Sequence, residues 1–276
     1  MVVAFWRVLA DIGLTTVPEF RDPFARRMLR GPIWKFLIAR AERIARKPDN
    51  ELRRSILPFI DMVILRVAYI DACVERLRAP QVVILGAGLD TRAYRLTALR
   101  GVRVFETDHR ASQAYKRERA SRLGPSLAEV HYAPIDFTRH ELGSALSFAG
   151  YDPRLPTLWI WEGVTMYLND AALRKTLRGV RQLSAPGSTL LVHYHEAQKF
   201  DGTTLGRKLI LAWAREPQIG LRSRDTMRAE LERAGFVVTG DAGLVEQARH
   251  IGAHPPPAAK LPSSRIMTAH VPAVQI

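Results

Sequence analysis

The run of residues 81–96 constrains the fold of this chain more than any other stretch. Its apolar segment, residues 82–85, is typical of a strand that is buried on both faces, and Gly86 and Gly88 follow at once. Glycine lets the backbone turn sharply and leaves it bare beside a ligand. We expect the residues after Gly88 to begin a helix whose free N–H groups face that ligand. The pattern therefore predicts a nucleotide-binding turn.

An acidic strand end follows at the spacing that such a turn requires. The third glycine of the dinucleotide fingerprint is replaced by Thr91, so the glycines alone are weak evidence. The next strand-like run, residues 102–105, leads into Glu106 and Asp108, about 20 residues after the turn, where related folds hold ribose hydroxyls. A tight turn in any α/β protein explains the glycines but not the acids, and this favours a ligand site.

Several motifs together resemble the leucine carboxyl methyltransferase-like family of S-adenosylmethionine-dependent O-methyltransferases. Residues 83–96 are similar to its first motif. The other matching segments, in chain order, are RDPFA at 21–25, RVAYID at 66–71, FETD at 105–108, PIDF at 134–137 and WEGVTMYL at 161–168. They cover residues 20–170 in family order, whereas the C-terminal third matches only loosely. One motif alone is weak, but six in order are specific.

The resemblance implies S-adenosyl-L-methionine as cofactor. Arg66 is expected to pair with the methionine carboxylate, and Asp136 with Phe137 to hold the adenine, although Asp136 could instead cap a helix. Glu162 ends a strand-like run, where a buried carboxylate needs a cation or a donor. The expected cofactor-binding residues are Arg66, Gly86, Ala87, Gly88, Asp90, Thr91, Glu106, Asp108, Asp136, Phe137 and Glu162.

The expected fold class is α/β. We predict a doubly wound, Rossmann-like methyltransferase sheet that is mostly parallel with an antiparallel last strand, residues 266–271. Residues 1–276 would form a single domain. Residues 1–80 would be an N-terminal helical lid, and residues 81–276 the core, with a lid insertion at about 196–222. Carboxyl ends of parallel strands meet at one edge, so the predicted ligands should converge there.

The composition bears on partners and location. A formal net charge of +14 favours an anionic small-molecule acceptor, and the scattered arginines form no dense tract of the kind that nucleic-acid binding would favour. Cys73 is the single cysteine, so no disulfide can form within the chain. We expect Cys73 to be a small buried residue. No stretch is long and apolar enough to span a membrane, and the N-terminus does not resemble a signal peptide, so a cytoplasmic location is expected.

Methyl transfer by direct displacement needs positioning more than covalent catalysis. A carboxylate acceptor is already ionised at neutral pH, whereas a hydroxyl would need a base. The candidates for contact with the acceptor are Tyr167, His193 and His195, and no metal is expected. Two alternatives stay open, a Rossmann-type oxidoreductase and a basic nucleic-acid-binding or inactive paralogue. The sequence fixes no oligomeric state.

Overall fold

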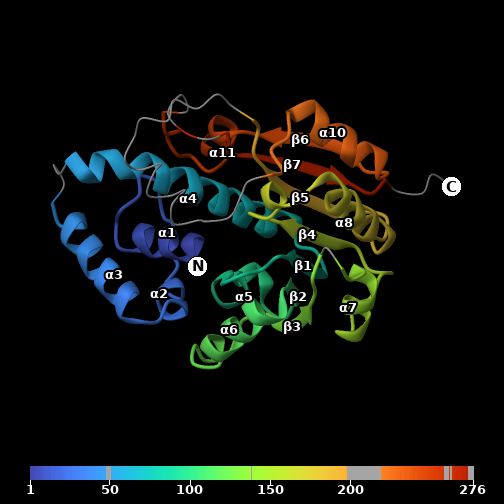
Figure 1. Ribbon diagram of the computed structural model, residues 1–276, viewed down its shortest axis with the longest axis horizontal. Coiled ribbons are helices and arrows are strands. Elements are labelled where there is room, and N and C mark those ends of the chain that lie inside the picture. Colours follow the sequence, from blue (N-terminus) through green and yellow to red (C-terminus); the bar gives the residue numbers. More distant parts are fainter. Residues whose placement is uncertain (48–50, 138, 198–218, 258–260, 262, 273–276) are drawn as a thin grey trace.

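A single twisted sheet organises the molecule (Figure 1). The computed structural model describes residues 1–47, 51–137, 139–197, 219–257, 261 and 263–272. In this part of the chain seven strands pair in the order β3-β2-β1-β4-β5-β7-β6. β7 runs antiparallel to both of its neighbours, and the other pairings are parallel. The strands are β1 (Gln81–Leu85), β2 (Arg103–Asp108), β3 (Glu129–Pro134), β4 (Thr157–Trp161), β5 (Thr189–Tyr194), β6 (Val237–Ala242) and β7 (Arg265–His270).

Helices cover both faces because the strands are apolar on both sides. Val82 and Ile84 of β1 belong to one core cluster and Val83 and Leu85 to the other, as the two-residue period of a strand requires. The first face packs against α4 (Glu51–Leu77), α5 (Arg92–Arg95), the 3-10 turn η1 (Thr97–Leu99) and α6 (Arg110–Ala120). The second packs against α7 (Leu142–Phe148), α8 (Asp170–Gln182) and α10 (Arg224–Arg233). The doubly wound fold expected from the sequence is confirmed.

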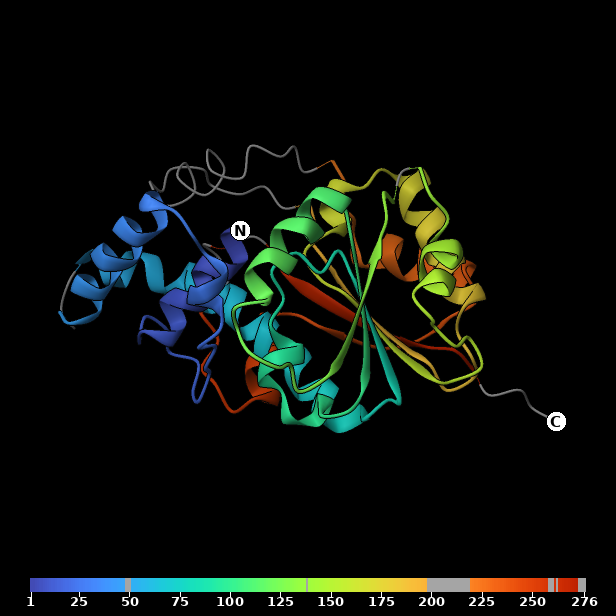
Figure 2. The ribbon, with the colours of Figure 1, turned by 90° about the horizontal axis from the view of Figure 1, so that it is seen from below.

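The N-terminal helices gather at one end of the sheet (Figure 2). They are α1 (Val2–Asp11), α2 (Ala25–Met28) and α3 (Pro32–Ala45). A third core cluster joins α1, α3 and the first part of α4 to α11 (Leu244–His250). The last part of α4 lies on the sheet and buries Cys73 completely, as expected. α4 therefore ties the N-terminal helices to the sheet. In the described residues no helix is long and apolar enough to cross a membrane.

Two helices differ from what their residues indicate. Lys116 is buried in α6, although basic residues dominate that helix. The helix after Gly88 is the four-residue α5, so its dipole offers a ligand little. The expected lid insertion lies mostly outside the described residues, since 198–218 are not among them.

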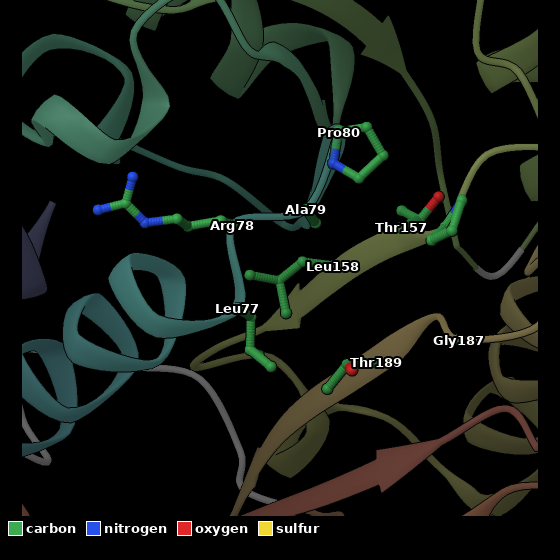
Figure 3. A pocket seen from close by; sticks show the side chains of 9 residues that line it. Leu77, Arg78, Ala79, Pro80, Thr157, Leu158, Gly187 and Thr189 are labelled. Carbon is green, nitrogen blue, oxygen red and sulfur yellow. The ribbon is translucent and has the colours of Figure 1, made fainter.

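A cavity of about 120 Å³ lies at the amino ends of β1, β4 and β5 (Figure 3). Its lining residues are Leu77, Arg78, Ala79, Pro80, Pro156, Thr157, Leu158, Gly187 and Thr189. The glycine turn follows the carboxyl end of β1, so it lies at the opposite edge of the sheet. In parallel sheets ligands bind outside the carboxyl ends, and the cavity is therefore not part of the strand-end site.

Candidate functional site

The glycine turn has the geometry that glycine is needed for. Gly86 and Gly88 have φ angles of +70° and +52°. A Cβ on Gly86 would lie 2.4 Å from Cγ2 of Val164, in the loop after β4, so that loop packs directly on the turn. The backbone N–H of Gly88 donates to Oδ2 of Asp108 at 2.5 Å. The predicted meeting of the turn with the acidic end of β2 is therefore found.

Glu162, just past β4, bridges two arginines. Its Oε1 accepts from Nε of Arg66 at 2.8 Å, and its Oε2 accepts from Nη2 of Arg92 at 2.9 Å. Burial opposes ionisation of Glu162, but the charges of Arg92 and Arg66 outweigh it and lower the pKa of the carboxyl. Glu162 does face cations, as expected, and here those cations come from α4 and α5.

The guanidinium of Arg92 also binds two further carboxylates. Its Nε donates to Oδ1 of Asp71 at 2.6 Å, and its Nη1 pairs with Oδ2 of Asp90 at 2.5 Å. Arg95 pairs with the other oxygen of Asp71 at 2.6 Å. Asp90 also accepts from the backbone N–H of Arg92 at 2.7 Å, so it fixes the start of α5. The result is a buried ion-pair network beside the glycine turn.

Three donors in this network have no hydrogen-bond partner among the described residues, namely Nη2 of Arg66 and Nε and Nη2 of Arg95. Arg66 is 4% exposed, and its Nη2 is buried without a hydrogen bond. Its Nη1 lies 3.4 Å from Nε2 of His193. A buried guanidinium N–H without an acceptor is unfavourable, so Arg66 has spare capacity for an anionic group.

Glu106 lies apart from this network. It points from β2 toward α6, on the same face as Val104, and its Oε2 is 2.5 Å from Nζ of Lys116. Both side chains are 1% exposed. Burial raises the pKa of Glu106, and Lys116 opposes that rise. Glu106 therefore forms a buried ion pair that joins β2 to α6. Its expected contact with the cofactor stays a prediction.

Asp136 and Phe137 follow β3 beside the end of β2. The backbone N–H of Ile135 donates to the carbonyl oxygen of Asp108 at 2.8 Å, which fixes this loop against Asp108. The side chain of Asp136 is 27% exposed and lies 3.7 Å from Nε of Arg139. α7 begins only at Leu142, with Glu141 as its N-cap, so Asp136 does not cap that helix. Both residues lie at the predicted edge.

The two histidines at the end of β5 are buried and neutral. Their rings meet edge to face with centroids 4.7 Å apart. The N–H of Gly163 donates to Nδ1 of His193 at 3.3 Å, and Nε2 of the same ring lies 3.1 Å from Oγ of Ser264. Burial, with Arg66 and His195, holds the pKa of His193 well below its usual value. Burial and Arg66 lower the pKa of His195 to about 4. In the described part of the chain no three His, Cys, Asp or Glu residues are grouped to hold a metal.

Tyr167 belongs to the 3-10 turn η2 (Thr165–Tyr167) and is half-buried. Arg222 fixes this turn, because its Nη1 donates to the carbonyl of Thr165 at 3.2 Å and its Nη2 to that of Leu168 at 2.8 Å. Thr165 Oγ1 donates to the carbonyl of His193 at 2.7 Å. Tyr167 is thus carried on a firmly held loop, and its contact with an acceptor stays a prediction.

Sequence reasoning missed several members of the network. Arg92, Arg95 and Asp71 all lie inside the motifs quoted above, but no local pattern pairs them. Arg222 lies outside those motifs. The sequence signal for these residues is that charged side chains are concentrated within otherwise apolar segments. Such charges require partners when they are buried.

The comparisons with known proteins assign the family. A family model described as leucine carboxyl methyltransferase matches residues 1–181 of the 276. The chain belongs to the leucine carboxyl methyltransferase family. The matched part contains the glycine turn, Arg66, Arg92, Asp108 and Glu162, so the resemblance inferred from the motifs is confirmed.

Curated relatives of this leucine carboxyl methyltransferase family member include proteins from Mycobacterium and Streptomyces. A protein of Mycobacterium sp. (strain KMS) is 32% identical over 196 residues, which cover 70% of this chain and 64% of that protein. A Streptomyces coelicolor protein is 35% identical over 179 residues, which cover 62% of this chain and 60% of that protein. Both are named as S-adenosyl-L-methionine-dependent methyltransferases. The match spans less than two thirds of the length of these relatives.

Solved structures share the fold of this family member. A structure titled as a methyltransferase from Thermobifida fusca superposes with a TM-score of 0.55 at 15% identity, covering 97% of this chain and 94% of that one. A DUF574 family protein from Streptomyces avermitilis gives 0.56 at 14% identity, covering 97% of both chains. At such identities the likeness establishes the Rossmann-like fold alone.

Proposed function

We propose that this chain is an S-adenosyl-L-methionine-dependent O-methyltransferase that methylates a carboxylate of a small anionic acceptor. Membership of the leucine carboxyl methyltransferase family supports the reaction class and argues against the nicotinamide-dependent alternative. The observation that carries the proposal is the strand-end arrangement. The glycine turn, Asp108 and the Arg66–Glu162 pair lie at the carboxyl edge of the sheet, and Arg66 has a buried donor to spare.

The described residues fit the cofactor. Nη2 of Arg66 suits the methionine carboxylate, because a guanidinium can bind Glu162 through Nε and still donate elsewhere. Asp108 suits the ribose hydroxyls, and Asp136 with Phe137 suits the adenine. When bound, the cofactor supplies an activated methyl group. The protein contributes position, since Glu162 and Arg92 hold Arg66 in place.

The state of the histidines supports a carboxylate acceptor. His193 is enclosed and both of its ring nitrogens are engaged, and the pKa of His195 is lowered to about 4. Such groups are weak bases for a phenol or an alcohol, whose protons leave only near pH 10 or above. A carboxylate needs no base. The net charge of +14 also favours an anionic acceptor.

Arg66→Lys tests the cofactor contact. Lysine keeps a positive charge opposite Glu162 but removes the spare N–H. We expect affinity for S-adenosylhomocysteine to fall about tenfold in isothermal titration, as for the loss of a hydrogen bond to a charged group. Affinity for adenosine, which has no carboxylate, should stay unchanged.

Arg174→Lys is the matched control, because Arg174 pairs with Glu230 in α10 at 2.8 Å, away from the turn. It should leave both affinities unchanged. Equal weakening of S-adenosylhomocysteine and adenosine in the Arg66 variant would contradict the assigned role. Absence of any binding to the unaltered protein would contradict the function itself. The acceptor class is tested by mass spectrometry of candidate acids and their hydroxyl analogues for added methyl groups.

A further inference from the structure

The hydroxyl of Thr91 links the glycine turn to the N-terminal segment. Nη1 of Arg7, on α1, donates to Oγ1 of Thr91 at 2.9 Å, and that oxygen donates to Oδ2 of Asp22 at 2.7 Å. All three side chains are buried, with exposed fractions of 4%, 0% and 0% for Arg7, Asp22 and Thr91. The hydroxyl of Thr91 therefore accepts one hydrogen bond from the N-terminal segment and donates another to it.

The same three residues also fix the backbone on both sides of the contact. Nη2 of Arg7 donates to the carbonyl oxygen of Leu89 at 2.5 Å, and its Nη1 pairs with Asp22 at 2.9 Å. Oδ1 of Asp22 accepts from the N–H of Ala25 at 3.0 Å, at the start of α2. The turn, α1 and the start of α2 are thus joined by one set of buried polar contacts.

This arrangement gives a physical reason for threonine at the position where the dinucleotide fingerprint has glycine. Glycine would leave the buried pair of Arg7 and Asp22 without the hydroxyl that binds both of them, and an incompletely satisfied buried charge is costly. The turn itself holds two flexible glycines, and the contact with Arg7 adds to those with Asp108 and Val164 in holding its backbone in one conformation.

We propose that Arg7, Asp22 and Thr91 are positioning residues that couple the N-terminal segment to the glycine turn. Docking of α1 then holds the turn in its binding conformation, and a ligand on the turn stabilises the docked α1 in return, as linkage requires. The effect on ligand affinity rests on the function proposed above. The coupling itself does not, because it joins two parts of the ligand-free protein.

Thr91→Val is the direct test, because it keeps the shape of the side chain and removes the hydroxyl. Thr91→Ser restores the hydroxyl. Thr176→Val is the matched control, since Thr176 is also buried and its hydroxyl bonds to Ala172 within α8 at 2.9 Å. Each variant is compared by hydrogen exchange of residues 2–11 and 86–95, and by titration with S-adenosylhomocysteine.

We expect Thr91→Val to speed exchange in both segments and to weaken S-adenosylhomocysteine binding about tenfold. Thr91→Ser and Thr176→Val should both stay within about twofold of the unaltered protein. Faster exchange in only one of the two segments, or unchanged affinity in the folded variant, would overturn the coupling. If the unaltered protein does not bind S-adenosylhomocysteine, the proposed function fails, and the joint exchange of the two segments still decides the coupling.

Discussion

At the scale of single residues, burial and neighbouring charges determine the protonation state of a side chain more than its residue type does. His195 and His193 look like bases in the sequence, but both are buried beside Arg66, which disfavours their protonated forms. Glu162 is ionised although it is buried, because two guanidinium groups contact it. The same side chains on an exposed loop would be ordinary titrating groups.

The pKa of His195 predicts a dependence of stability on pH. The folded pKa is about 4, below the ordinary value of 6.5, so between these values the unfolded chain binds a proton that the folded chain does not. The stabilising contribution of the neutral His195 is therefore fully present above pH 6.5 and is lost as the pH drops toward 4. His195 alone accounts for about 3 kcal/mol on this scale, and His193 acts in the same direction.

His195→Gln should remove its share of that loss, so the free energy of unfolding measured in urea should fall less between pH 7 and pH 5 than in the unaltered protein. His254→Gln serves as the control, because His254 is exposed. Equal pH slopes for the unaltered protein and the His195 variant would contradict the prediction.

At the scale of elements, the loop after β4 is held by Gly220 and Arg222. The N–H of Gly220 donates to the carbonyl of Met166 at 2.9 Å, and Arg222 donates to the carbonyl of Gly220 at 2.7 Å. Val164 in the same loop contacts Gly86. The position of the glycine turn thus depends on a segment more than a hundred residues later in the chain.

Gly220→Ala should destabilise the protein by about 1–3 kcal/mol. Its Cβ would lie 2.4 Å from the carbonyl oxygens of Leu168 and Thr165, and backbone atoms do not move aside cheaply. Gly143→Ala is the control, because its Cβ would lie 3.7 Å from Leu183 and alanine favours the α7 helix by about 0.5–1 kcal/mol. Urea unfolding measures both. A Gly220 variant as stable as the unaltered protein would show that the loop adapts.

At the scale of the whole molecule, the net charge of +14 does not by itself mark a nucleic-acid-binding protein. Several arginines are used internally, and Arg7, Arg66, Arg92 and Arg222 are each at most 5% exposed. We therefore expect only weak, nonspecific contact with polyanions. The expected cytoplasmic location stays a prediction.

Fluorescence anisotropy with duplex DNA checks this expectation. Binding seen at 20 mM salt should be lost near 150 mM, since nonspecific contacts depend steeply on counterion release. Heparin gives a comparison without base pairs and should show the same salt dependence. Tight binding to DNA at physiological salt would favour the nucleic-acid alternative instead.

The sequence by itself determined the sheet, the glycine turn and the family. These depend on local patterns, namely continuous apolar runs typical of buried strands, the glycines at positions 86 and 88, and motifs in a fixed order. For the same reason it placed Asp108, Asp136 and Glu162 at strand ends, which topology brings to one edge.

Only the tertiary structure decided which charges pair. Arg7 meets Thr91 across 84 positions, and Arg66 meets Glu162 across 96. Forty-one basic and 27 acidic residues allow many pairings, and nothing local selects among them. The tertiary structure also decided the ion pair between Lys116 and Glu106 and the hydrogen bonds from Arg222 to the η2 loop. Burial selects such partners, because a charge removed from water must find a counterpart within reach of its own side chain.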